Sequence, residues 1–203
     1  QGVTALDEGP YTLRIYKGSV AGFDQNKNVF FTEIMAELSD DDGFREWTEL
    51  FNNENSAYNL FRKRVIINGT TYYIGCKNAT SDCNTLGPGG DGEDVIIRPK
   101  SYLLFAGSTD MTQNGGWDNV IWSWNAGSII PSTGTTITLQ HTNNSTCDSV
   151  NISGWTIPSD QSLNLDPDRF SKTDNNTSGN WCPANNDGTP PDMTPGLPNQ
   201  QCP

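Results

Sequence analysis

Residues 44–60 read FREWTELFNNENSAYNL, and this stretch decides the fold class. In residues 45–52 polar and apolar side chains alternate before an Asn-rich break, which is typical of a β-strand with two different faces. Because neighbouring side chains of a strand point to opposite faces, Glu46 and Glu49 face opposite ways. A glycosidase needs two carboxylates that converge within roughly 5–10 Å. We therefore expect a scaffold strand, in which Glu49 is half-buried and hydrogen-bonded.

The rest of the chain repeats this pattern. Short apolar segments, often alternating, are separated by Gly, Pro, Asn and Asp, which predicts an all-β sandwich or barrel. Asn68-Gly69 is a two-residue hairpin signal. We expect strands at residues 11–18, 29–37 and 45–52, and then near RVIING, TYYIG, DVIIRP, SYLLFAG, NVIWSW, TTITLQ and CDSVNISGW.

From about Ser159 the chain becomes turn-rich and Pro-rich. Such a segment rarely forms strand ladders, because proline lacks the N–H donor. Trp181 and the spacing of Cys182 and Cys202 indicate that it is tied down. We expect a C-terminal clasp that lies along the sandwich.

The first residues stand apart from this body. Residues 1–10 (QGVTALDEGP) read as an extended arm, followed by the strand-like YTLRIYKG. The sequence thus divides into an N-terminal arm or strand at residues 1–28 and one sandwich domain at residues 29–203. The arm is either the first strand of its own sheet or a strand that pairs with the open edge of a neighbouring subunit.

Charge and composition exclude some function classes. The chain has 203 residues, 33% of them hydrophobic, with 12 basic and 24 acidic residues and a net charge of −12. Nucleic-acid binding requires clustered Lys and Arg, so we expect no nucleic-acid partner. No apolar run approaches the roughly 18 residues of a membrane span, so we expect none in this chain.

Five cysteines bear on the compartment. Cys76 and Cys83 would close a short loop, and Cys182 and Cys202 would pin the C-terminal tail. Each disulfide would add roughly 2–3 kcal/mol of stability by loop entropy. Both belong in an oxidising compartment, which indicates a secreted or cell-surface protein. Cys147 is the odd cysteine, either a buried free thiol or a partner in another pairing.

Few residues suggest a metal site or a nucleophilic triad. The only histidine, His141, follows TITLQ and is expected to cap a strand at a hairpin. No cofactor is required by this sequence. Calcium is the one candidate ligand, because Asp40 and Asp42 in one acidic turn, and Asp91 and Asp94 in another, could offer oxygen atoms. Solvated acidic loops are the alternative.

Aromatic residues give a further lead. Trp117, Trp122 and Trp124 fall within eight residues. They either pack in the core or form an exposed stripe that stacks on sugar rings or fills a subunit pocket. Candidate N-glycosylation sequons, used only in a host that glycosylates asparagine, begin at Asn68, Asn78, Asn144, Asn151 and Asn176.

Several motifs occur in a telling order. EIM at residues 33–35 is followed by EWTELFN at 46–52, YNL at 58–60 and DVIIRPKSYLLFAGS at 94–108, with Lys100 where glycine is usual. STGTTITLQ, CDSVNIS and the ending SLNLDP, NWCPA and TPGLPNQQC continue the series. From about Val29 to Cys202 this order resembles the lamin-tail domain family of bacterial secreted proteins.

That resemblance implies an immunoglobulin-like β-sandwich of extracellular type. It also implies a Cys182–Cys202 disulfide, since that cysteine pair recurs in secreted members. Lamin-tail domains are non-catalytic modules of structural, adhesive or accessory type, so we expect no enzymatic activity.

Two versions of the function stay open. The chain is a self-associating surface or filament subunit, with its arm completing a neighbour's sheet. Alternatively it is a monomeric adhesion or binding module for extracellular protein or glycan, calcium-assisted, beside a secreted enzyme.

Overall fold

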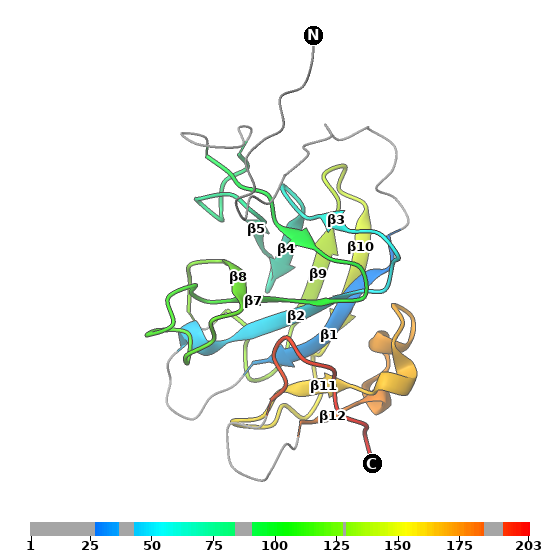
Figure 1. Cartoon of the computed structure of the whole chain (residues 1–203). Coiled ribbons are helices and arrows are strands. Elements are labelled where there is room, and N and C mark those ends of the chain that lie inside the picture. Colours follow the sequence, from blue (N-terminus) through cyan, green and yellow to red (C-terminus); the bar gives the residue numbers. More distant parts are fainter. Residues whose placement is uncertain (1–26, 37–42, 84–90, 128, 185–192) are drawn as a thin grey trace, which may run out of the picture.

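The computed structural model describes residues 27–36, 43–83, 91–127, 129–184 and 193–203. These residues form an all-β sandwich, which confirms the predicted fold class (Figure 1). Within them the helical structure is limited to short 3-10 turns. The predicted strand at residues 11–18 and the arm that contains it lie outside the described residues.

The described residues form three sheets. The six-stranded sheet has the order β12-β11-β1-β2-β7-β8, the four-stranded sheet β10-β9-β4-β5, and a two-stranded ribbon joins β3 and β6. The strands are β1 (Val29–Met35), β2 (Trp47–Asn52), β3 (Tyr58–Asn59), β4 (Arg64–Ile67), β5 (Thr70–Tyr73), β6 (Ile96–Ile97), β7 (Tyr102–Ala106), β8 (Val120–Ser123), β9 (Thr136–Gln140), β10 (Thr146–Asn151), β11 (Leu163–Leu165) and β12 (Trp181–Pro183).

Local sequence accounts for most of these strands. At the β4–β5 hairpin, Asn68 and Gly69 have φ values of 49° and 77°. Two residues with positive φ give the turn that suits the twist of a hairpin, as the dipeptide predicts. β8 differs from the other strands of its sheet because it pairs with β7 in parallel. No local sequence pattern predicts this parallel pairing.

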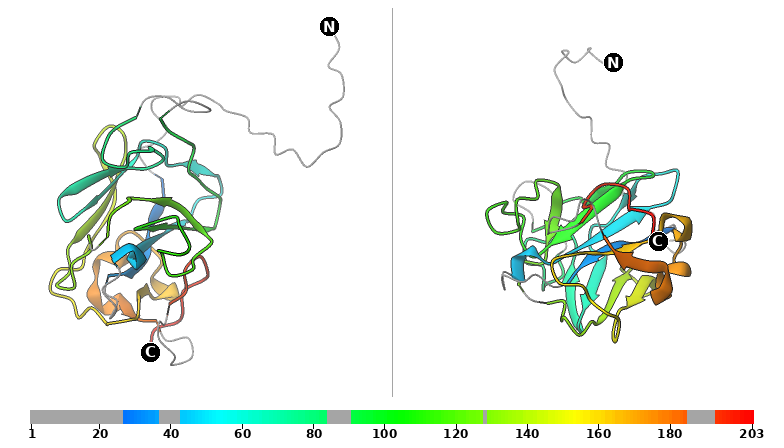
Figure 2. Two further views of the ribbon diagram at one scale, coloured as in Figure 1. Left: turned by 90° about the vertical axis from the view of Figure 1, so that its left-hand side faces the viewer. Right: turned by 90° about the horizontal axis from the view of Figure 1, so that it is seen from below.

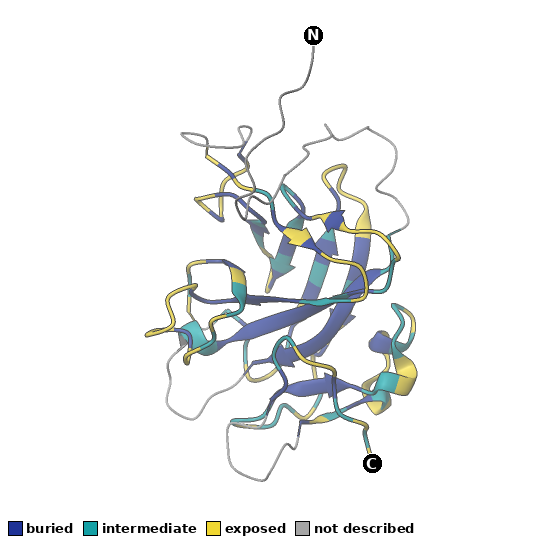
Figure 3. Cartoon of the chain, in the orientation of Figure 1, coloured by how far each residue is buried: buried dark blue, intermediate teal, exposed yellow. Residues whose placement is uncertain are grey.

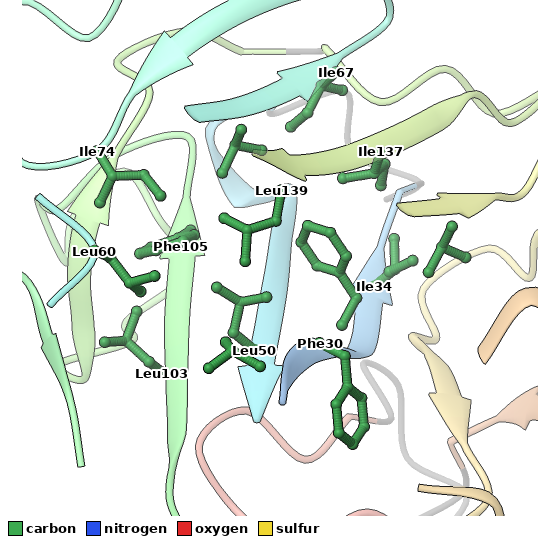
Figure 4. Packing of buried hydrophobic residues seen from close by; sticks show 14 of the residues in the cluster. Phe30, Ile34, Leu50, Leu60, Ile67, Ile74, Leu103, Phe105, Ile137 and Leu139 are labelled. Atoms are coloured by element: carbon green, nitrogen blue, oxygen red, sulfur yellow. The ribbon is translucent and has the colours of Figure 1, made fainter. Parts of the chain in front are cut away.

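The core lies between the two large sheets. Ile34, Leu50 and Phe105 from the six-stranded sheet pack with Ile137 and Leu139 of the four-stranded sheet in one core cluster (Figure 4). All five are fully or almost fully buried. Burying each such side chain contributes about 1.5–3 kcal/mol, so this layer is the main source of stability. The central strands β1 and β2 are buried along most of their length (Figure 3).

The segment after Ser159 corrects one expectation. It was predicted to avoid strand ladders, but it contributes β11 and β12 to the six-stranded sheet. β11 pairs with β1 and has no proline. β12 lies at the sheet edge and ends at Pro183. Proline is tolerated at an edge, where a missing N–H interrupts no further ladder, and this explains how a Pro-rich clasp can also be part of the sheet.

Candidate functional site

A row of polar and disulfide-bonded residues crosses the six-stranded sheet on the face away from the core. The strand register places Glu49 opposite Glu33, Glu33 opposite Asn164, and Asn164 opposite Cys182. The row therefore runs through β2, β1, β11 and β12 in turn. Glu33 and Glu49 are both fully buried, so Glu49 is more deeply buried than predicted.

Residues 193–202 cover this row, and we call them the C-terminal strap (Figures 1 and 2). The Thr194 backbone N–H donates to Glu33 Oε1 at 2.8 Å, and its hydroxyl donates to Glu33 Oε2 at 2.7 Å. The Gly196 N–H donates to Glu49 Oε2 at 2.7 Å. Two carboxylates thus accept the hydrogen bonds that hold the strap.

The far end of the strap is held by other members of the row. Asn164 donates to the Gln200 carbonyl at 2.8 Å and accepts from the Gln200 N–H at 3.1 Å. Asn199 donates to the Thr32 and Leu165 carbonyls. The Cys182–Cys202 disulfide closes the end. The expected clasp is confirmed, and its contacts now have named partners.

Burial also sets the ionisation of the two carboxyl groups. Loss of hydration raises the pKa of Glu33, against hydrogen bonds from Ser162 and Thr194 that lower it. Loss of hydration raises the pKa of Glu49 further, and the neighbouring Glu33 charge adds to this. Burial and the same two charges raise the pKa of Tyr102 to about 12. The raised pKa values favour the protonated form of both carboxyl groups, which are buried and therefore not exposed to a substrate.

Glu46 lies on the opposite side of β2 from Glu49, as the strand period predicted. Its Oε2 accepts from the Ile129 and Ile130 N–H groups at 2.7 and 2.9 Å. Burial raises the pKa of Glu46 to about 7, although the hydrogen bonds from the two N–H donors partly oppose this rise. The two carboxylates of the EWTE motif therefore bind different loops and do not converge.

The cysteine predictions are confirmed. Cys76 pairs with Cys83, and Cys182 pairs with Cys202. Cys147 is a buried free thiol, which selects one of its two predicted states. Burial raises the pKa of the Cys147 thiol. The buried thiol therefore has little thiolate character.

The metal and histidine predictions have different outcomes. His141 lies at the β9–β10 turn as predicted, buried, with its Nδ1 3.0 Å from the Tyr58 hydroxyl. Asp40 and Asp42 lie outside the described residues. Asp94 accepts from Asn59, and Asp91 lies in the same loop. Within the part of the chain that the structure describes, no three metal-ligating side chains come together, so calcium binding stays a prediction.

The alternative of an exposed aromatic stripe is wrong for two of the three tryptophans. Trp122 and Trp124 are 4% and 1% exposed and belong to the main core. Trp117 is half-buried and packs against a smaller cluster around Trp47 and Met193. Residues two apart in a strand share a face, and the Trp124 N–H still donates to the Ala106 carbonyl of β7 at 3.2 Å, so Trp122 and Trp124 both face the core. The five sequon residues are all exposed: Asn68, Asn78, Asn144, Asn151 and Asn176.

A second pair of tryptophans, which the sequence did not indicate, lines a pocket. Trp155 follows β10 and Trp181 begins β12, and their ring centroids lie 5.9 Å apart with planes at 55°. The pocket measures about 520 Å³ and is also lined by Pro158, Pro183 and Leu163. The Trp181 indole N–H donates to the Asn175 carbonyl at 2.9 Å, which fixes that ring.

The two large sheets have four edge strands. β12 and β8 are the edges of the six-stranded sheet, and β10 and β5 are the edges of the four-stranded sheet. Sheet edges are ready templates for pairing with another chain, so each is a candidate interaction site.

Among the described residues, no helix is long and apolar enough to span a membrane. A scan against protein-family models and searches of curated proteins and of solved structures found no match to this chain.

Proposed function

We propose that this chain is a non-catalytic extracellular subunit that self-associates, with residues 1–28 of one copy adding a strand to the sheet of the next. The observation that carries the proposal is the open edge at β8. Two disulfides support an oxidising, extracellular setting. The burial of Glu33 and Glu49 beneath the strap supports the absence of catalysis, because their hydrogen-bonding capacity holds the chain's own C-terminal residues.

Three of the four edges are blunted. β12 has three residues and ends at Pro183. At β5, the Tyr73 N–H already donates to the Ala79 carbonyl at 2.6 Å. At β10, the Cys147 carbonyl accepts from Lys172 Nζ at 2.7 Å. Short strands, proline and covering loops are the usual ways in which proteins protect an edge.

β8 is short, with four residues, but lacks the other protections. Within the described ranges, its side away from β7 has no strand or backbone partner, and Ile121 of β8 is 50% exposed. An incoming strand would complete the ladder and cover this apolar side chain. That is β-augmentation, in which backbone hydrogen bonds give affinity and alternate side chains give specificity.

The arm offers a suitable strand. Residues 11–18 (YTLRIYKG) alternate apolar and polar side chains. Residues 19–26 join them to the sandwich and can span roughly 27 Å when extended. The chain enters the sheet at β1, which β2 and β7 separate from β8. Because neighbouring strands lie about 4.8 Å apart, an arm of this reach can pair with β8 of its own chain or of another copy, and the particle size distinguishes the two.

The test measures particle size by light scattering and negative-stain microscopy. We compare the full chain, a chain without residues 1–27, and Ile121→Lys, which places a charge on the β8 edge. Leu197→Lys is the matched control, because Leu197 is 61% exposed on the strap. We expect large particles for the full chain and the control, and monomers for the other two. Assembly that persists without the arm would reject the proposal, as would a full chain that stays monomeric.

A second candidate function, a binding module for an extracellular ligand, is favoured by the Trp155–Trp181 pocket.

A further inference from the structure

The pocket between Trp155 and Trp181 has a buried side and a partly exposed side. Trp181 is 8% exposed and is anchored through its indole N–H to Asn175. Leu163 of β11 is buried beside it. Trp155 lies on the loop after β10 and is half-buried, so part of its ring faces solvent. An aromatic surface that is partly exposed and partly locked is ready for stacking without further ordering.

The rim of the pocket is polar and uncharged. Thr156 and Ser178 are both exposed and line the pocket, as does Pro183. None of the described residues that line it is charged. A volume of about 520 Å³ is within the usual range of small-molecule sites, roughly 300–1,000 Å³.

We propose that this pocket binds one or two rings of a neutral saccharide. A sugar ring presents C–H groups on its faces and hydroxyl groups around its edge. The faces suit the indoles of Trp155 and Trp181, and the edge hydroxyls suit the Thr156 and Ser178 hydroxyls, which both donate and accept. The pocket does not include the β8 edge. A negative result for saccharide binding would therefore leave the assembly proposal unaffected, and the reverse also holds.

Two other ligand classes fit less well. An anionic ligand finds no cation in the lining, and the chain carries a net charge of −12. A Pro-rich peptide also docks on aromatic grooves, where its carbonyl groups only accept hydrogen bonds. The Trp181 N–H already donates to Asn175, and the Thr156 and Ser178 hydroxyls can use both their donor and their acceptor groups with the hydroxyls of a sugar but only their donors with peptide carbonyls. The uncharged, hydroxyl-rimmed pocket therefore favours the saccharide.

The experiment titrates the full chain by calorimetry with neutral oligosaccharides: the hexamers of cellulose, xylan, laminarin, mannan and chitin. We expect saturable binding of at least one. Trp155→Ala should weaken it by about tenfold. Trp117→Ala is the matched control, because Trp117 is likewise half-buried but lies on another cluster, and it should bind as the full chain does.

A second variant guards against a Trp155→Ala chain that fails to fold. Thr156→Ala combined with Ser178→Ala removes only exposed hydroxyls and should weaken binding by roughly fivefold or more with unchanged thermal stability. The proposal is overturned if no neutral oligosaccharide binds, or if a decaproline peptide binds more tightly than all of them. It is also overturned if Trp117→Ala weakens binding as much as Trp155→Ala does.

Discussion

Thr194→Val tests whether the buried carboxylates hold the C-terminal strap. The change keeps the size of the side chain and removes one hydroxyl, which donates to Glu33 Oε2 at 2.7 Å. Both residues are buried, at 7% and 0% exposed, so water cannot replace the lost donor without opening the strap. A hydrogen bond to a charged group contributes about 1.5–3 kcal/mol, and one to a neutral group about half of that. We expect the free energy of unfolding to fall by about 2 kcal/mol at pH 8.

The pH dependence of this loss gives the sharper test. Burial raises the pKa of Glu33, and the Thr194 hydroxyl lowers it. Without that hydroxyl the folded-state pKa rises further above the unfolded value. A raised folded-state pKa means stability that is present below the unfolded pKa and is lost as the pH rises. The deficit of the variant should therefore be larger at pH 8 than at pH 4.

The assay is urea unfolding at both pH values with disulfides intact, followed by tryptophan fluorescence. Thr112→Val is the matched control, because the Thr112 hydroxyl donates to the Asp110 carboxylate at 2.8 Å on the surface. It should cost less than about 0.5 kcal/mol. A Thr194→Val loss no greater than that of the control, or equal at the two pH values, would refute the reasoning.

Three further predictions concern the same scaffold. Burial raises the pKa of Glu46 to about 7, so its stabilising contribution is complete below about pH 4.5 and is lost as the pH rises through 7. The melting temperature of the protein should therefore be higher at pH 5 than at pH 8. Glu46→Gln should reduce this difference in melting temperature. Replacing Cys182 and Cys202 by Ser should lower the unfolding free energy by about 3 kcal/mol in urea titrations, from the loop of 20 residues. Gly134→Ala should cost more than about 2 kcal/mol in the same titrations, because its Cβ would lie 2.1 Å from the Ile152 carbonyl oxygen, whereas Gly154→Ala, with a similar φ and open space, should cost about 1 kcal/mol.

Local patterns predicted the parts of this fold that local forces determine. The Asn68-Gly69 hairpin follows from two residues that accept positive φ. The Cys76–Cys83 disulfide follows from a short spacing within one loop. The opposite faces of Glu46 and Glu49 follow from the strand period alone. In each case the partner is within a few residues along the chain.

Long-range pairings could not be read in this way. Glu33 and Glu49 meet because β1 and β2 pair with a register shift between Phe31 and Glu33, which no local pattern fixes. Trp155 and Trp181 meet because the turn-rich segment between β11 and β12 brings β12 back to pair with β11. The parallel pairing of β8 with β7 depends likewise on the whole sheet. These contacts form the candidate site and the candidate edge, so function was less predictable than fold class.

The two buried carboxylates have a physical reason to be where they are. The strap contains Pro195 and Pro198, which lack an N–H, so it cannot pair with the sheet as a continuous strand. The N–H groups of Thr194 and Gly196 lie against the sheet, and buried donors need acceptors. Glu33 and Glu49 reach out from the sheet and supply them.

A carboxyl group accepts through two oxygens, so one residue can hold a backbone N–H and a hydroxyl together, as Glu33 does with Thr194. A Pro-rich segment is thereby fixed across a sheet that it cannot extend. The cost is the burial of two neighbouring acids, which raises the pKa of both above the unfolded-state values. The folded chain should therefore be most stable under mildly acidic conditions, and the attachment of the strap rather than a substrate accounts for the paired acids of this fold.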